Sequence, residues 1–107
     1  IGDIGHSIQN FVESFGFSVI KNYVGHGIGR SVHEAPSVPN YGKKFSGPVI
    51  ENGLVIAIEP MVSIGSPELE ALSESGWNVV TKDRSLCAHF EHTVAITEEG
   101  TFVLTLV

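Results

Sequence analysis

A chain of 107 residues suffices for one domain that buries roughly two thirds of its unfolded surface. Hydrophobic residues make up 42% of the chain and charged residues 17%, a balance that fits a packed globular protein and excludes a disordered one. The net charge of −6 leaves no basic surface for a phosphate backbone, so we expect no nucleic-acid partner.

The single cysteine, Cys87, rules out an internal disulfide and fits a reducing compartment. We expect Cys87 to be a small buried hydrophobe at the entry of a strand. No stretch approaches the ~20 apolar residues that span a bilayer, and the N-terminus lacks the regions of a signal peptide. These features predict a cytoplasmic protein with no membrane partner. The chain opens on Ile1 without a methionine, which favours a fragment of a longer protein.

Apolar residues recur at helical spacing over residues 4–15 and predict an amphipathic helix, with Asp3 as its N-cap and Gly16 at its end. The following run, at 17–24, is rich in aromatic and β-branched residues and predicts a strand. This strand leads directly into a glycine-rich stretch at 25–34, which is therefore held on a rigid support.

The stretch at 25–34 is the first candidate site. Its glycines allow the backbone to approach a ligand closely, while His26 and His33 present two imidazoles. Imidazole is the commonest protein metal ligand and carries protons near neutral pH. A glycine-rich turn whose two histidines make ordinary hydrogen bonds is an equally weighted alternative.

A buried strand is predicted further along, after an irregular connection at 35–53 that is long enough to be a functional loop. The continuous apolar run at 54–58 is typical of a strand covered on both faces, and it ends in Glu59. An unpaired carboxylate in a dry interior costs several kcal/mol, so Glu59 needs a compensating partner. The alternative is that Glu59 lies at the strand end and reaches solvent or a buried lysine.

The remainder of the chain predicts further strands. Residues 63–76 are polar and loop-like, 77–81 and 86–96 are expected as strands, and 101–106 closes a terminal hairpin. Glu91 lies in the middle of the longer strand, between histidines, although an exposed position on a polar face is its common alternative. His89 and Thr93 share its face.

Burying any one of His26, Glu59 and Glu91 in a protein core without a partner would cost free energy. They become mutually consistent if they converge on a cation. Two carboxylates and one imidazole favour a hard or borderline divalent metal over a metal that prefers thiolates.

With these residues in place, the chain resembles the methionine aminopeptidases, which have the pita-bread metalloenzyme fold. Three motifs carry the resemblance in the family's order: Gly-His-Gly-Ile-Gly at 25–29 with His33-Glu34, Ile-Glu-Pro-Met-Val at 58–62, and Lys-Asp-Arg-Ser at 82–85 leading to Glu-His-Thr at 91–93. The first motif is shared with prolidases, whereas the Glu-Pro-Met and Glu-His-Thr forms point to the methionine enzymes. The resemblance covers the whole chain and implies an α+β fold. That fold is the C-terminal half of a pita-bread (creatinase/aminopeptidase) fold, with an antiparallel sheet and a flanking helix.

The resemblance also implies roles for individual residues. His26, Glu59 and Glu91 would be metal ligands, with Glu91 bridging two divalent ions of cobalt, iron, manganese or zinc. Glu59 would accept a proton from water, His33 would contact the scissile amide, and Trp77 would line the pocket for the methionine side chain. The implied reaction is metal-dependent removal of the N-terminal methionine from nascent polypeptides. Only 31 residues separate the two glutamates, as in the type I enzymes.

One departure limits the resemblance. The family completes its site with two aspartates and a further histidine upstream, whereas this chain has only Asp3 and Asp83. We therefore expect residues 1–107 to be the C-terminal half of the catalytic domain, inactive alone and partnered by the missing N-terminal half. The competing hypotheses are a prolidase-like metallopeptidase and a non-catalytic peptide- or protein-binding relative of the same fold.

Overall fold

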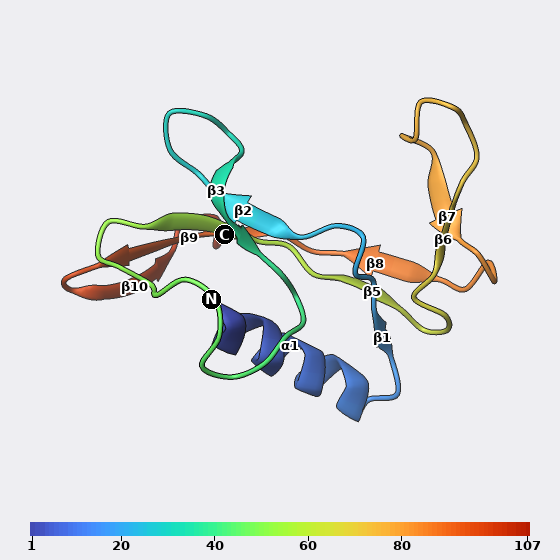
Figure 1. Ribbon diagram of the computed structural model, residues 1–107, viewed down its shortest axis with the longest axis horizontal. Helices are drawn as coiled ribbons and strands as arrows, with labels where there is room; N and C mark the ends of the chain where they lie inside the picture. Colours follow the sequence, from blue (N-terminus) through green and yellow to red (C-terminus); the bar gives the residue numbers. More distant parts are fainter.

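The computed structural model describes residues 1–107 and consists of one helix and three antiparallel sheets (Figure 1). The elements in chain order are α1 (Gly2–Ser14), β1 (Ser18–Val19), β2 (Gly25–Gly27), β3 (Glu34–Val38), β4 (Val55–Ile58), β5 (Met61–Ser63), β6 (Leu69–Ala71), β7 (Val79–Thr81), β8 (Cys87–His89), β9 (His92–Thr97) and β10 (Gly100–Val103). The sheets have the orders β10-β9-β4-β2-β3, β1-β5-β8 and β6-β7. The expected α+β fold, an antiparallel sheet with a flanking helix, is confirmed.

Helix α1 packs against β1 and β3 and ends near the predicted place. Gly16 follows it with a φ of +77°, a left-handed conformation that glycine adopts without strain. The predicted N-cap is wrong: Ile1 occupies that position, and the Asp3 carboxylate instead accepts hydrogen bonds from the backbone N–H of Phe45. With 13 residues, α1 is too short to cross a membrane.

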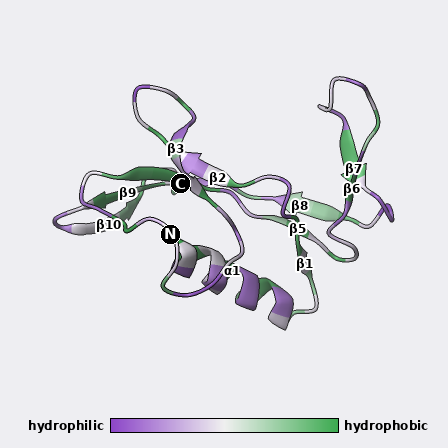
Figure 2. Cartoon of the chain, viewed as in Figure 1, coloured by the Kyte–Doolittle hydropathy of each residue, from purple (hydrophilic) through white to green (hydrophobic).

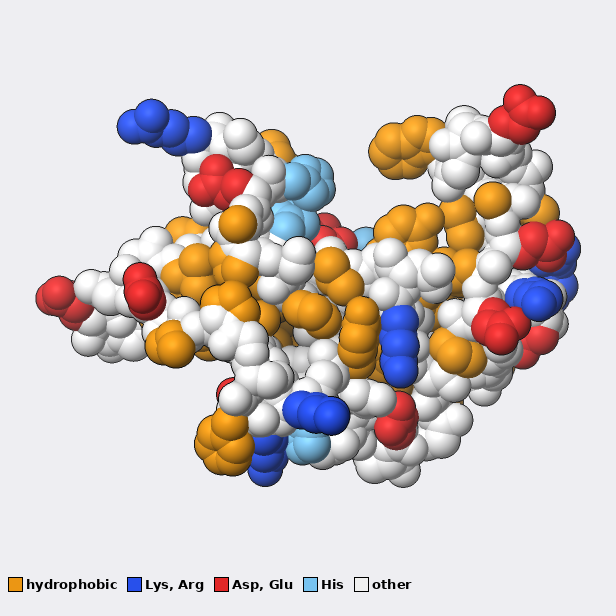
Figure 3. Space-filling model, in the orientation of Figure 1, with side chains coloured by type: hydrophobic (Ala, Val, Ile, Leu, Met, Phe, Trp, Pro, Cys, Tyr) orange, Lys and Arg blue, Asp and Glu red, His pale blue; other side chains and the backbone are white.

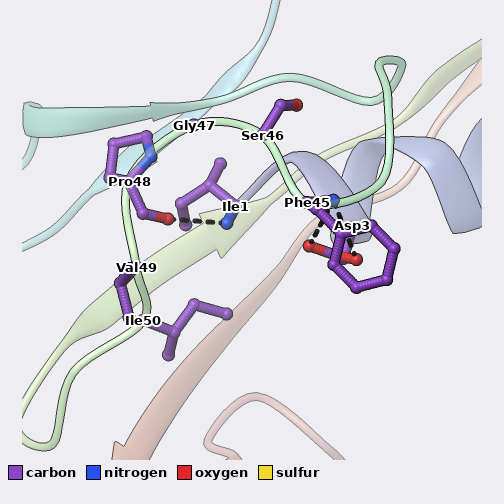
Figure 4. Close-up of a pocket in the computed structure, with 8 residues that line it drawn as sticks. All are labelled: Ile1, Asp3, Phe45, Ser46, Gly47, Pro48, Val49 and Ile50. Atoms are coloured by element: carbon purple, nitrogen blue, oxygen red, sulfur yellow. Dashed lines mark hydrogen bonds between the residues drawn. The ribbon is translucent and has the colours of Figure 1, made fainter.

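A cavity of about 400 Å³ lies between the start of α1 and the segment at 45–50 (Figure 4). The Ile1 amino group donates to the carbonyl of Pro48 at 2.8 Å, which ties the two segments together. The cavity has no histidine or cysteine, and the carboxylate of Asp3 already accepts hydrogen bonds from Phe45. We therefore assign this cavity no chemical role.

Several predicted strands differ from those observed. The strand at 17–24 is only two residues long, because its remaining residues pass between two sheets. The connection at 35–53 begins with β3, and the loop at 63–76 contains β6. Each becomes a strand by pairing with its neighbour in the chain, β2 or β7, which its own composition does not indicate. Proline is compatible with β3 because β3 is the edge strand of its sheet.

The predicted strand at 86–96 is split in two, and this break organises the molecule. The chain runs from β4 in the five-stranded sheet to β5 in the three-stranded sheet, and it returns from β8 to β9. The pairing of Ile58 with His92 and that of Met61 with His89 keep one register across the break. The two segments thus form one long antiparallel ribbon with an unpaired joint at 59–60 and 90–91. A backbone hydrogen bond from Phe90 N–H to Pro60 O, at 3.2 Å, links the two sides of the joint.

The core lies beneath the five-stranded sheet. Ile56 and Val94 are paired across β4 and β9, and they pack with Ile1 and Val38. Apolar residues run along β4 and β9, whereas β2 is hydrophilic (Figure 2). The prediction that Cys87 is buried is wrong, because no element covers that face of β8 and the side chain is exposed.

Candidate metal centre

The strand pleat brings the predicted ligands to one face. His26 pairs with Ala57, and Ala57 pairs with Thr93, so these three side chains point to the same side of the sheet. Glu59 is two residues beyond Ala57 and Glu91 is two residues before Thr93, positions that face the same way in an extended chain. Ile56 and Val94 alternate with them and point into the core.

The ligand atoms of His26, Glu59 and Glu91 lie within 4.8 Å of one another. The side chains of His26 and Glu59 are only 14% and 15% exposed, whereas Glu91 is open to solvent. Neither glutamate lies within a strand, because both occupy the joint of the ribbon. The strand-end position considered for Glu59 is thus correct, and the mid-strand position predicted for Glu91 is not. The joint frees both carboxylates to turn toward His26.

A glycine allows β2 to approach this closely. A Cβ at Gly25 would collide with the carbonyl oxygen of Ala57, which belongs to the neighbouring strand β4. The collision is with backbone, so no rotation of a side chain would relieve it. Glycine before His26 therefore holds the imidazole close to the joint.

The hydrogen bonds of His26 define which nitrogen faces the carboxylates. Its Nδ1 lies 2.9 Å from the carbonyl oxygen of Gly27, and a carbonyl can only accept, so Nδ1 carries the proton in the neutral ring. The bare Nε2 then lies 3.3 Å from Oε1 of Glu59. In the neutral ring both of these atoms are acceptors, so their approach is favourable only when they share a cation, either a proton or a metal ion. Metal-binding histidines commonly donate their second N–H to a backbone carbonyl in this way.

Glu59 is held from two further directions. Its Oε2 lies 3.2 Å from Nε2 of His89, and its backbone carbonyl accepts a hydrogen bond from Nδ2 of Asn40 at 3.4 Å. Neither residue was assigned a role from the sequence. His89 shared the predicted face of Glu91, which was a usable signal, whereas Asn40 lies in a segment without any periodic pattern.

His33 lies next to the cluster, and Trp77 does not. The ring centroids of His33 and His26 are 4.0 Å apart, with His33 carried by the loop between β2 and β3. Trp77 is 90% exposed, in the turn between β6 and β7. This hairpin and the β2–β3 loop project from the same side of the molecule (Figure 1), and the surface is hollowed between them, with histidine side chains on its wall (Figure 3).

Asp83 fastens the base of the β6–β7 hairpin. Its carboxylate accepts hydrogen bonds from the backbone N–H groups of Ser66, at 2.8 Å, and Ser85, at 3.0 Å. These bonds, the one from Ser66 first, hold the pKa of Asp83 below its ordinary value. Asp83 therefore orders the hairpin that carries Trp77, and its position is outside the His26 cluster.

The residues of the cluster fit a divalent metal ion. They offer an imidazole nitrogen whose tautomer is fixed and two carboxylates, a set that suits a hard or borderline metal. Exposed acidic groups alone would not define such a site, but here the bare nitrogen of His26 faces a carboxylate oxygen. The fold and these residues make the cluster a candidate metal centre of the histidine and carboxylate class.

The chain belongs to metallopeptidase family M24, whose sequence model it matches over residues 1–98. It is 55% identical to a methionine aminopeptidase of Clostridium acetobutylicum over 104 residues, which are 97% of this chain and 41% of that protein. It is 50% identical to methionine aminopeptidase 1 of Bacillus subtilis, covering all of this chain and 43% of the relative. The chain thus spans about two fifths of the length of the curated relatives it matches.

Solved structures share the fold. The methionine aminopeptidase of Thermotoga maritima superimposes with a TM-score of 0.93 at 54% identity, covering 99% of this chain and 42% of that one. The enzyme of Rickettsia prowazekii gives a TM-score of 0.93 at 42% identity, covering 98% and 42% of the two chains. The predicted membership of the pita-bread fold is therefore confirmed.

Proposed function

We propose that this chain supplies part of the active site of a metal-dependent aminopeptidase that removes the N-terminal methionine from nascent polypeptides. The observation that carries the proposal is the convergence of His26, Glu59 and Glu91, whose ligand atoms lie within 4.8 Å of one another. The names of the relatives supply the substrate class, since the relatives and the solved structures described above are methionine aminopeptidases.

In the proposed site, His26, Glu59 and Glu91 would hold the metal ions, with Glu91 as the ligand that two ions would share. Divalent ions, two per complete site and drawn from cobalt, iron, manganese or zinc, supply Lewis acidity toward the substrate carbonyl and an activated water. Glu91 suits a shared position because it is the most exposed of the three ligands and is therefore accessible to a second ion.

Glu59 and His33 perform the steps that the protein itself contributes. Glu59 accepts the proton of the attacking water on a carboxylate oxygen, close to the reacting atoms. His33 lies beside His26 at the open side of the cluster, and there it donates a hydrogen bond to the scissile amide as charge develops. Trp77 forms one wall of the methionine pocket from the β6–β7 hairpin.

The chain requires a partner to complete this site. It has no aspartate near the centre, because Asp3 bonds to Phe45 and Asp83 to the hairpin base. We propose that residues 1–107 are the C-terminal half of the catalytic domain and that the partner is the N-terminal half of the same protein. The exposed apolar face beside α1 supports this assembly: a surface of Phe11, Phe15, Phe17, Val62, Ala88 and Phe90 surrounds an open cavity of about 390 Å³.

We place this activity in the cytoplasm, where nascent chains are made. The support comes from the sequence, since a single cysteine suits a reducing compartment.

The decisive experiment is reconstitution. The 107-residue chain is assayed with Co²⁺ on a Met-Ala peptide and an Ala-Pro peptide, alone and together with the unmatched segment of the Clostridium acetobutylicum enzyme. We expect no turnover by the chain alone and cleavage of the methionyl peptide by the mixture. A Glu91→Gln chain in the same mixture is the matched control and should be inactive.

Each other outcome identifies an error. Robust activity of the chain alone would contradict the partial site. Preferential cleavage of the Ala-Pro peptide would favour a prolidase-like enzyme, and binding of the segment without metal or turnover would favour a non-catalytic relative.

A further inference from the structure

We propose that His89 is a positioning residue, which holds Oε2 of Glu59 so that Oε1 faces His26 and Glu91. This inference rests on the proposed metal site but concerns a residue outside its ligand set. His89 is absent from the group of ligand atoms that converge, so it acts through Glu59 and does not bind the metal itself.

The ribbon fixes the place of His89. It pairs with Met61 across β5 and β8, two residues before Glu91 and on the same face. Met61 in turn is two residues beyond Glu59, so the imidazole of His89 reaches the Glu59 carboxylate diagonally across the joint. The observed contact is 3.2 Å, between Nε2 of His89 and Oε2 of Glu59.

The chemistry of the contact gives the two histidines opposite tautomers. An ionised carboxylate only accepts hydrogen bonds, so Nε2 of His89 must carry a proton. His26 carries its proton on Nδ1 and presents a bare Nε2 to Oε1. Oε2 of Glu59 thus has a hydrogen-bond donor, whereas Oε1 faces a ring nitrogen that, in the neutral ring, has no proton to donate and is free to bind a metal ion. Oε1 is therefore the oxygen of Glu59 that is left without a hydrogen-bond donor.

A second contact supports the same reading of Glu59. The amide of buried Asn40 donates to the Glu59 backbone carbonyl, so the main chain of the joint is fixed while His89 fixes the carboxylate. Glu91 has no comparable anchor among the hydrogen bonds of the structure, and it is exposed. The two carboxylates therefore differ: Glu59 is held before a metal binds, and Glu91 must be ordered by the metal.

The first test measures Co²⁺ affinity of the full chain, by competition with a chromophoric chelator, in three variants. His89→Phe keeps a ring and removes the donor, His89→Gln restores an N–H at similar reach, and His6→Phe removes a histidine of α1 as the matched control. We expect about 10-fold weaker binding in His89→Phe, the size typical for an outer partner of a ligand, and little change in the other two variants. Circular dichroism confirms that the variants share one fold.

Two results would overturn the role of His89. One is unchanged affinity in His89→Phe. The other is a loss in His89→Gln as large as that in His89→Phe, which would assign the effect to the ring itself.

A second test needs no metal. Nitrogen-detected NMR at about pH 8, where an ordinary imidazole is neutral, reports the tautomer of each ring. We expect the proton on Nε2 of His89 and on Nδ1 of His26, and a shift of the His89 signals in Glu59→Ala. A proton on Nδ1 of His89 would refute the proposal even if Co²⁺ binds. Absence of Co²⁺ binding with the expected tautomers would instead refute the proposed metal site and leave the His89 contact intact.

Discussion

The two larger sheets are built on the same ribbon but differ in what covers them. Beneath the five-stranded sheet, Ile56 and Val94 are enclosed by Ile1 and Val38. The three-stranded sheet instead exposes its apolar side chains beside the aromatic residues of α1, around a cavity lined by Phe17, Val62, Ile64, Leu86, Cys87 and Ala88. The five-stranded sheet buries its apolar side chains in a core. The three-stranded sheet has similarly apolar side chains, but no element of this chain covers them.

This difference explains the position of the candidate site. The ligands lie at the joint between the sheets, with His26 on the packed side and His89 on the open side of Glu59. The packed sheet gives His26 a fixed support, whereas the open sheet exposes an apolar surface beside the candidate site.

The largest expected effect is a loss of stability when a buried residue of the five-stranded sheet is truncated. Ile56 is 1% exposed, so Ile56→Ala should lower the free energy of unfolding by about 2–5 kcal/mol, through lost burial and a residual cavity. Urea denaturation followed by circular dichroism measures the change. Val32→Ala, at an exposed loop position, should stay within about 0.5 kcal/mol and serves as the control. A cost below about 1 kcal/mol for Ile56→Ala would mean that the sheet is not packed as described.

The next largest effect is expected at His26, the candidate ligand on the five-stranded sheet. His26→Ala should weaken Co²⁺ binding by more than about 100-fold, since even outer partners of metal ligands contribute about 10- to 100-fold. Isothermal titration calorimetry measures the affinity, with His6→Ala as the histidine control. Equal affinity in the two variants would place the metal elsewhere on the chain.

An effect of pH is expected at the base of the β6–β7 hairpin. Hydrogen bonds from Ser66 and Ser85 lower the pKa of Asp83 in the folded state below the ordinary value of 3.8, so the folded state favours the ionised form. The stabilisation is complete above pH 3.8 and is lost as the pH falls through the lower folded pKa. Hydrogen exchange of the Lys82 amide, which donates to Glu68, should report this loss.

Asp83→Asn is the matched variant for this measurement, because it keeps the size and removes the titration. Its Lys82 exchange, corrected for the intrinsic rate, should be insensitive to pH across the same range. A pH dependence equal to that of the unsubstituted chain would assign the effect to another group.

The smallest effect on stability tests the open sheet. Leu86 is 76% exposed, so Leu86→Lys should change the free energy of unfolding by no more than about 0.5 kcal/mol. The added charge should nevertheless reduce self-association of the chain, as seen by light scattering, because charged side chains protect exposed strands. A loss of stability comparable to that of Ile56→Ala would show that this face is packed after all.

The sequence singled out three residues that the structure brings together, His26, Glu59 and Glu91, but it misplaced several of the strands around them. Glu59 and Glu91 stood out because a carboxylate in an apolar run needs compensation, and the strand period placed His89 on the face of Glu91. The break at Phe90 and Glu91 left no signal, since a ribbon that changes sheets reads as one alternating run. β3 and β6 were missed because their hydrogen-bond partners, and not their composition, make them strands.

Because the register of the ribbon is continuous, the segment between Ser63 and Cys87 can change in length without shifting the ribbon. Ser63 and Cys87 are paired, so the β6–β7 excursion leaves and re-enters the ribbon at fixed points. Doubling the length of such a loop costs only about 0.6 kcal/mol of closure entropy, and it moves neither glutamate. One residue inserted between Ile58 and Met61 would instead turn the following side chains to the opposite face. The fold therefore separates a segment that tolerates growth from a joint that tolerates none.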